Sequence, residues 1–151
     1  MNRTIRTLRL TAALALTSCS AAPAVSPAPS ANGALVARLY AEVFNGHDLS
    51  AAESLLSEAY VQHNPQVPTG RAGFMQAFRG FHSAYPQLHV EVKRVVAEGD
   101  LVVVHSHWQL SPTDRGSAVV DIFRVANGAL VEHWDVVQPV PEQAANSNTM
   151  F

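Results

Sequence analysis

The sequence predicts a small α+β domain in which helices at its start pack on one face of a curved, mostly antiparallel sheet. Two observations predict it. Apolar residues in the first half recur at helical spacing, and those in the second half form long β-branched runs separated by turn signals. Helices followed by a meander of strands are typical of α+β proteins. A chain of 151 residues, 48% hydrophobic and 15% charged, is expected to form one domain.

The first residues predict an export signal rather than part of the domain. Residues 1–9 carry three arginines and no acid, and residues 10–17 are apolar. This is the pattern of a secretory signal, and the apolar run is too short to cross a bilayer of ~30 Å as a helix. The run ends in Leu16-Thr17-Ser18-Cys19, which resembles a bacterial lipobox. We therefore expect a signal peptide over residues 1–19, with Cys19 lipidated as an anchor in the cell envelope. The alternative is a plain signal on a soluble secreted or periplasmic protein.

Residues 20–32 predict a tether between this signal and the domain. The segment reads SAAPAVSPAPSAN, with three prolines and no charged or aromatic residue. Such a composition does not bury enough apolar surface to fold. The domain is therefore expected over residues 33–151.

The elements of the domain follow from periodicity and turn residues. Apolar residues spaced three and four apart predict helices over residues 33–44, 49–56 and 70–85, with a short extended piece over 60–64. Strands are predicted over residues 88–97, 101–110, 117–125 and 129–138. Asn127-Gly128 is a strong signal for a two-residue hairpin turn. The formal net charge of −2 gives no field that would attract nucleic acid.

Five motifs follow one another along the domain: Tyr60-Val61-Gln62-His63-Asn64-Pro65, His105-Ser106-His107-Trp108, Asp121-Ile122-Phe123-Arg124, Glu132-His133-Trp134-Asp135 and Asn146-Ser147-Asn148-Thr149-Met150-Phe151. Together they resemble the SnoaL-like, or polyketide cyclase-like, family of the nuclear transport factor 2-like superfamily. The final motif is similar to the end of a subgroup described as predicted aldol-condensation enzymes. The resemblance implies a cone-shaped sheet (a cystatin-like α+β roll) around an internal cavity. It is weak for substrate, because this fold hosts cyclases, isomerases, hydrolases, dehydratases and non-catalytic binders.

The orientation of the last hairpin decides which residues face that cavity. With a two-residue turn at Asn127-Gly128, Asp121 lies opposite Trp134 and shares a face with Phe123. A three-residue loop would instead put Asp121 opposite His133. Both faces are mostly apolar, so periodicity leaves the choice open. The resemblance implies that Asp121 lies inside the cone as the acid/base residue.

Histidines supply the expected partner of Asp121. His105 and His107 share one face of the preceding strand, and we expect His107, or else His105, beside Asp121. His63 is expected to close the pocket from the helix side. Our hypothesis is that Asp121 abstracts a proton α to a carbonyl, while His107 or His63 donates to the enolate oxygen.

A small hydrophobic ligand is the expected occupant. We expect His105, Trp108, Phe123 and Trp134 to contact it, with the tryptophans as apolar walls. The chemistry needs no cofactor. Among the possible metal ligands, only His105-x-His107 has close spacing, so no metal site is predicted.

Two other classes of function stay open. The domain can be a non-catalytic cup that holds a hydrophobic molecule, or an interaction module that uses its sheet to form a homodimer. A poised Asp/His pair favours the enzyme, and a pocket lined only by apolar residues favours the binder. Export weighs against polyketide biosynthesis, which takes place in the cytoplasm.

Overall fold

The computed structural model describes residues 30–151. The helices are α1 (Ala31–Arg38), the π-helix η1 (Leu39–Asn45), α2 (Ala51–Leu55) and α3 (Arg71–Ala84), and the strands are β1 (Leu56–Gln62), β2 (His89–Glu98), β3 (Leu101–Gln109), β4 (Ser117–Ala126) and β5 (Ala129–Pro139). The sheet has the order β1-β5-β4-β3-β2, with β1 parallel to β5 and the other pairs antiparallel. The predicted α+β class with a mixed sheet is therefore confirmed. The predicted signal, Cys19 and most of the tether lie outside the described residues.

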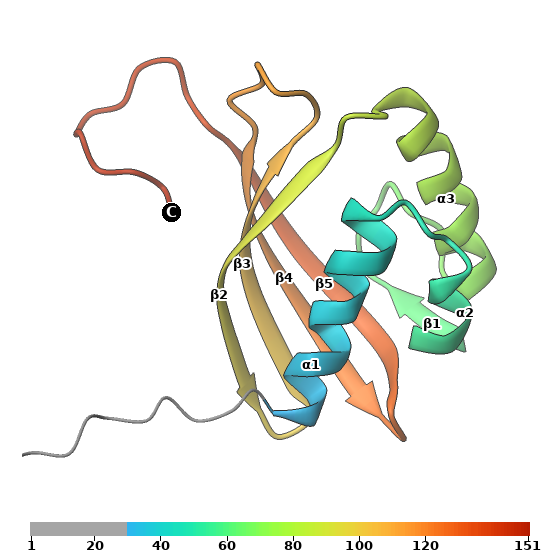
Figure 1. Cartoon of the computed structure of the whole chain (residues 1–151). Helices are drawn as coiled ribbons and strands as arrows, with labels where there is room; N and C mark the ends of the chain where they lie inside the picture. Colours follow the sequence, from blue (N-terminus) through green and yellow to red (C-terminus); the bar gives the residue numbers. More distant parts are fainter. Residues whose placement is uncertain (1–29) are drawn as a thin grey trace, which may run out of the picture.

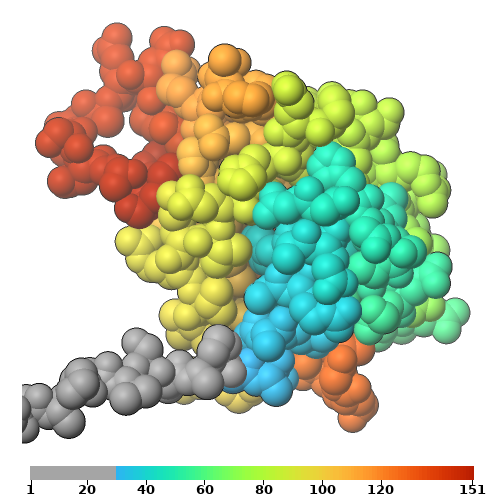
Figure 2. Space-filling model, viewed as in Figure 1, coloured from blue at the N-terminus to red at the C-terminus, as the bar shows by residue number. Residues whose placement is uncertain are grey.

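The helices lie on one side of the curved sheet, and the C-terminal segment lies on the other side (Figure 1). In the space-filling view this last segment stands out from the body of the domain, beside β2 and β3 (Figure 2). The core between helices and sheet is built from fully buried side chains such as Val36, Leu39, Leu55, Val102 and Leu130. Within residues 30–151, no helix has the length and apolarity to cross a membrane.

The first helix begins earlier than expected. Ala31 and Asn32, predicted as the end of the tether, belong to α1 because the Ser30 hydroxyl accepts a hydrogen bond from the Gly33 N–H at 3.0 Å. A serine in this position satisfies one of the N–H groups that a helix start leaves without a partner.

The same helix widens into a π-helix at η1, which the sequence did not predict. Its end is marked by a hydrogen bond from the Gly46 N–H to the carbonyl of Ala41, five residues earlier, at 2.9 Å. Such wide turns occur often at functional sites. Here the π-helix contains Tyr40, which is buried between the helices and the sheet.

A β-bulge in β5 changes the register that the hairpin turn predicts. Ala126 pairs with Ala129 and Val125 with Leu130, as expected for the two-residue turn. Arg124 then pairs with Glu132, so Val131 is an extra residue on β5. Every later residue of β5 is shifted by one, and Asp121 lies opposite Asp135 rather than Trp134. Beyond the bulge, both predicted registers are wrong.

Candidate active site

A cavity of about 740 Å³ lies between the concave face of the sheet and the helices. Its helix side is aromatic, with Phe44, Phe74, Phe78 and Phe81, and Trp108 of β3 extends this wall. The rings contact one another closely, with Phe74 and Phe78 centred 4.5 Å apart and Phe44 and Trp108 4.9 Å apart. The sheet side is polar at its base: Tyr60 and Gln62 from β1, Asp121 from β4, His133 and Asp135 from β5.

Asp121 and His133 form a buried pair at this base. The His133 Nε2 lies 3.0 Å from Asp121 Oδ1, and the two residues are 7% and 3% exposed. The bulge brings them together, because it puts His133 on the concave face of β5. There His133 lies two residues before Asp135, which pairs with Asp121, so it is the diagonal neighbour of Asp121. The Tyr40 hydroxyl donates to the other carboxylate oxygen, Asp121 Oδ2.

The hydrogen bonds around His133 fix the tautomer of its neutral ring. The Asn64 backbone N–H donates to Gln62 Oε1 at 2.9 Å, which identifies that atom as the amide oxygen. The same oxygen lies 2.8 Å from His133 Nδ1, so Nδ1 carries a hydrogen and donates it. Nε2 is therefore the atom that gains or loses a proton, and it faces Asp121.

The two tyrosines near the pair keep their protons. Burial, strengthened by the charge of Asp121, raises the pKa of Tyr40 well above its usual value. Burial also raises the pKa of Tyr60, with smaller contributions from Asp121 and Asp135. Tyr40 is thus a donor to Asp121 over the whole physiological range.

Asp135 is a second carboxylate in the cavity. Its Oδ2 accepts a hydrogen bond from Asn64 Nδ2 at 2.6 Å. Ligand atoms of Asp121, His133 and Asp135 all lie within 4.8 Å of one another, so these three residues are the ones that could hold a divalent metal in the described part of the chain. Among these three, the Asp121–His133 contact of 3.0 Å is the one within hydrogen-bond distance.

His105 and His107 do not face the cavity, so the expectation that either lies beside Asp121 is wrong. On β3 the concave face carries Ser106 and Trp108, and the Trp108 indole donates to the buried Ser106 hydroxyl at 3.0 Å. His105 instead contacts Arg94, with 2.9 Å between His105 Nδ1 and Arg94 Nη1. Neighbours on a strand point to opposite faces, so Trp108 and His107 cannot both line the cavity.

His63 and Trp134 also lie outside the cavity, contrary to expectation. Their rings stack on the outer face with centroids 4.7 Å apart, and the Arg124 guanidinium lies 5.6 Å from the centre of the Trp134 ring. His63 Nε2 lies 2.9 Å from Glu132 Oε1. Of the predicted contact residues, Trp108 and Phe123 are in the cavity wall.

Sequence reasoning missed four site residues: Tyr40, Asn64, His133 and Asp135. The last two follow from the bulge, for which the sequence offers no local signal because β5 carries apolar and polar residues on both faces. A signal did exist on β3, where the bulky Trp108 is the more suitable residue for an apolar interior than either histidine.

The fold and this site define an α+β roll with a buried Asp–His pair at the base of a cavity whose helix side is aromatic. Residues 36–133 match the family model described as the SnoaL-like domain. The chain therefore belongs to the SnoaL-like family, as the motifs predict.

Solved structures agree with this membership. The chain is similar to wild-type IdmH, a putative polyketide cyclase from Streptomyces antibioticus, at 25% identity and a TM-score of 0.58, covering 70% of this chain and 91% of that one. It is similar to AclR, a putative hydroxylase from Streptomyces galilaeus, at 26% identity and a TM-score of 0.63, covering 76% and 83%. A putative ketosteroid isomerase from Kribbella flavida shares the fold at 22% identity and a TM-score of 0.63, covering 77% and 84%. No curated protein sequence matches the chain.

Proposed function

We propose that the protein is a cofactor-independent acid/base enzyme that moves a proton on a small hydrophobic carbonyl compound. The reaction is of the aldol-condensation or cyclase, isomerase or dehydratase type. The observation that carries the proposal is the buried contact between Asp121 and His133 at the base of an aromatic cavity. Membership of a family whose structural neighbours include a putative cyclase and a putative ketosteroid isomerase supports it.

The active form of the pair has an ionised Asp121 and a neutral His133, so that Asp121 Oδ1 and His133 Nε2 face each other as two proton acceptors with no hydrogen between them. Asp121 accepts the proton from the carbon α to the substrate carbonyl, and the C–H electron pair becomes the C=C bond of the enolate. The proton then passes to His133 Nε2 across the 3.0 Å contact, because Nδ1 is already occupied by its own hydrogen. From Nε2 it returns to another atom of the substrate, an alkoxide oxygen in an aldol reaction or a carbon in an isomerisation. Such transfers typically contribute ~10²–10⁴-fold.

The surrounding residues support this chemistry in different ways. The aromatic wall binds a flat substrate and excludes water, which strengthens charge interactions at the base. Asn64 holds one oxygen of Asp135 at 2.6 Å, so the other oxygen is available to a substrate hydroxyl. Tyr40 holds Asp121 from the side away from the cavity.

The test is the exchange of α protons in heavy water. With 2-tetralone, a flat bicyclic ketone, we expect the parent protein to accelerate deuterium incorporation measured by NMR. Asp121→Asn is expected to lower the rate by ~10²–10⁴-fold, since an amide accepts no proton from carbon. His133→Gln is expected to lower it as well. The matched control is Glu98→Gln, the same chemical change at an exposed position at the end of β2.

Two results would contradict the proposal. The first is an Asp121→Asn variant that exchanges deuterium at the parent rate. The second is a parent protein that binds 2-tetralone and other flat ketones without accelerating exchange. That second result would favour the non-catalytic binder, for which the aromatic lining of the cavity is the supporting observation.

We also propose that the protein is exported and anchored in the bacterial cell envelope through a lipid on Cys19. The support is the basic, apolar and small-residue order of residues 1–19. Radiolabelled palmitate should label the chain expressed in a Gram-negative host, and Cys19→Ser should remove the label. An unlabelled parent chain found only in the soluble periplasmic fraction would contradict the anchor.

A homodimer is the third part of the proposal, with a second copy covering the outer face of the sheet. Val120 and Val136 are paired across β4 and β5 on this face and are 37% and 68% exposed. Adjoining exposed apolar side chains on one face of a sheet are a feature of many protein–protein interfaces. Light scattering should give twice the chain mass, and Val136→Asp should give the monomer mass. A monomeric parent would contradict it.

A further inference from the structure

The loop of residues 110–116, between β3 and β4, forms one side of the cavity mouth; we call it the mouth loop. Leu110 and Thr113 to Gly116 line the cavity. The loop is organised by Asp114, whose carboxylate accepts the Leu110 N–H at 2.9 Å and the Gly116 N–H at 2.9 Å. Hydrogen bonds to this carboxylate lower the pKa of Asp114, so it is ionised and holds the loop at neutral pH.

His107 fastens this loop from the outer face of the sheet. Its Nε2 lies 2.8 Å from the carbonyl oxygen of Arg115, and because a carbonyl only accepts, Nε2 carries a hydrogen. The next residue, Gly116, has φ of +75°, and a Cβ there would lie 2.7 Å from His107 Nε2. The backbone therefore approaches the histidine as closely as a glycine permits.

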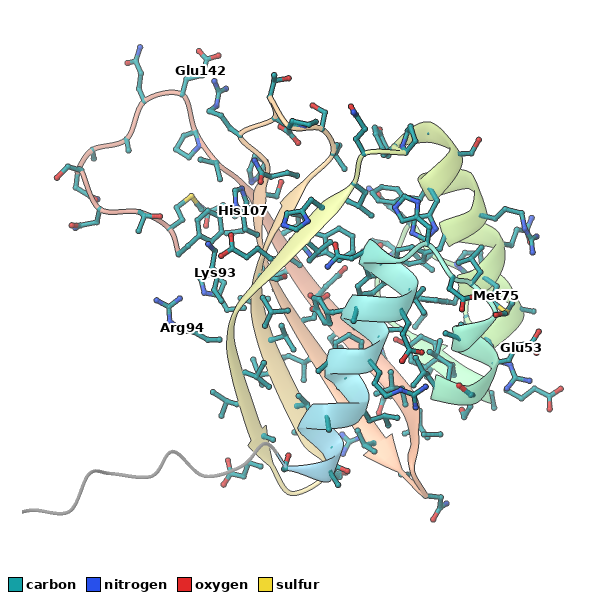
Figure 3. The ribbon with its side chains drawn as sticks, in the orientation of Figure 1. Glu53, Met75, Lys93, Arg94, His107 and Glu142 are labelled. Carbon is teal, nitrogen blue, oxygen red and sulfur yellow. The ribbon has the colours of Figure 1, made fainter. Side chains whose placement is uncertain are left out.

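Residues 140–151, the C-terminal tail, contact the mouth loop at their start and His107, which holds that loop, at their end. At the start of the tail, the Val140 N–H donates to the Gly116 carbonyl at 2.9 Å and Glu142 lies 3.1 Å from the Arg115 guanidinium. At its end, the ring of Phe151 lies 4.2 Å from the ring of His107. Figure 3 shows His107 and Glu142 on the tail side of the sheet, away from the helices.

A cation also contacts the end of the tail. The Lys93 ammonium lies 5.3 Å from the centre of the Phe151 ring, within the range of a cation–π contact. Phe151 thus contacts both Lys93 and His107.

We propose that Phe151 and His107 are positioning residues that hold the mouth loop inward and thereby set the size of the molecule that enters the cavity. The inference rests on the proposed function only in taking the cavity as the ligand site. Neither residue touches the cavity: Phe151 orders the His107 ring, and His107 holds the Arg115 carbonyl. Loss of either contact lets the loop move outward, and the mouth widens.

Amide hydrogen exchange in the full chain tests the first step. Phe151→Ala removes the stacked ring, and His107→Phe keeps a ring for Phe151 but removes the N–H. Both are expected to speed exchange at the Leu110 and Gly116 amides about three- to tenfold, the effect of one stacked pair or one hydrogen bond. Phe151→Tyr, which keeps the ring, is expected to retain the parent rates. Gln143→Ala, an exposed change in the same tail, is the matched control.

Two exchange results would overturn the proposal. One is parent exchange rates at Leu110 and Gly116 in both variants. The other is an equal increase at the Val104 amide in the middle of β3, which would make the tail a support of the whole fold rather than of the mouth.

Two fluorescent phenols test the second step, 2-naphthol and the larger 1-pyrenol. We expect Phe151→Ala and His107→Phe to bind 1-pyrenol about three- to tenfold faster while 2-naphthol binds as it does to the parent. Equal changes for both phenols, or binding of neither to any variant, would overturn the size-setting role. The proposed function is tested separately by α-proton exchange with 2-tetralone, so the two ideas fail independently.

Discussion

Replacing Asp121 by asparagine and by alanine tests the direction of the hydrogen bonds at the base of the cavity. Gln62 takes the Nδ1 hydrogen of His133, so Nε2 of the neutral ring is an acceptor. The amide of Asp121→Asn can donate from its nitrogen to Nε2 and accept the Tyr40 hydroxyl at its oxygen. The Tyr40 bond therefore survives in this variant, and Nε2, which faces a carboxylate oxygen in the parent, gains a donor.

The expected costs differ because alanine makes neither bond. Asp121→Asn replaces the charge-assisted Tyr40 bond by a neutral one but gives Nε2 a donor, so the unfolding free energy is expected to change by no more than about 1 kcal/mol. Asp121→Ala leaves the buried Tyr40 hydroxyl without a partner, at about 1–3 kcal/mol, and gives Nε2 nothing in return. Asparagine should thus lower exchange activity ~10²–10⁴-fold at little cost in stability, and alanine should lose both activity and stability.

Urea unfolding followed by circular dichroism measures both variants against the parent. The pair Glu98→Gln and Glu98→Ala is the control and is expected to change the unfolding free energy by less than about 0.5 kcal/mol. If Asp121→Asn were as destabilised as Asp121→Ala, Nε2 would be a donor in the resting protein. His133 would then be an imidazolium, and the form that abstracts the substrate proton would not be the resting one.

Three further predictions concern stability. The ring of His82 stacks on that of His47 at 4.0 Å, and burial, with the nearby charge of His47, lowers the pKa of His82 below 6.5. As pH falls below 6.5, the His82 imidazole therefore takes up a proton more readily in the unfolded chain than in the folded one, and the folded protein loses stability. The urea midpoint of His82→Phe should lack this decrease at low pH. Gly116→Ala should lower the unfolding free energy by more than about 2 kcal/mol in thermal unfolding, because φ is +75° and the new Cβ would lie 2.2 Å from the Trp108 carbonyl oxygen. A smaller decrease would show that the loop moves to make room for the methyl group. Because the pKa of Tyr40 is raised in the folded protein, the tyrosine of the unfolded chain ionises first above pH 10, and the parent loses stability there. Tyr40→Phe should therefore lose less unfolding free energy between pH 7 and alkaline pH than the parent does. Equal losses in the two proteins would contradict this.

The class of fold was predictable because it depends on periodicities that many residues share. Each strand in the second half was located to within a few residues, and Asn127-Gly128 forms the expected turn. The start of the domain shifted only because Ser30 caps the first helix, which begins at Ala31, two residues before the expected boundary at Gly33. The family resemblance, carried by the motifs, was confirmed.

The candidate site was predictable only in part, because it depends on single residues rather than on shared patterns. Asp121 was placed inside the cone through the resemblance, and it does line the cavity. Its partner was sought on β3 because His105 and His107 lie one strand away, yet Trp108 takes the inward direction. The true partner, His133, depends on one unpaired residue in β5, which neither composition nor alternation reveals.

Because Val131 stands outside the ladder, the side chains of β5 that follow it point to the opposite faces from those a regular strand would give them. Side chains of a strand have only two directions, so one inserted or deleted residue exchanges the entire inward set for the outward set. If Val131 were paired with Arg124 in a regular ladder, the interior would receive Glu132 and Trp134 in place of His133 and Asp135. Relatives that carry the same Glu-His-Trp-Asp letters in a hairpin of the same length, but pair it without the bulge, would therefore enclose a different chemistry behind the same motif.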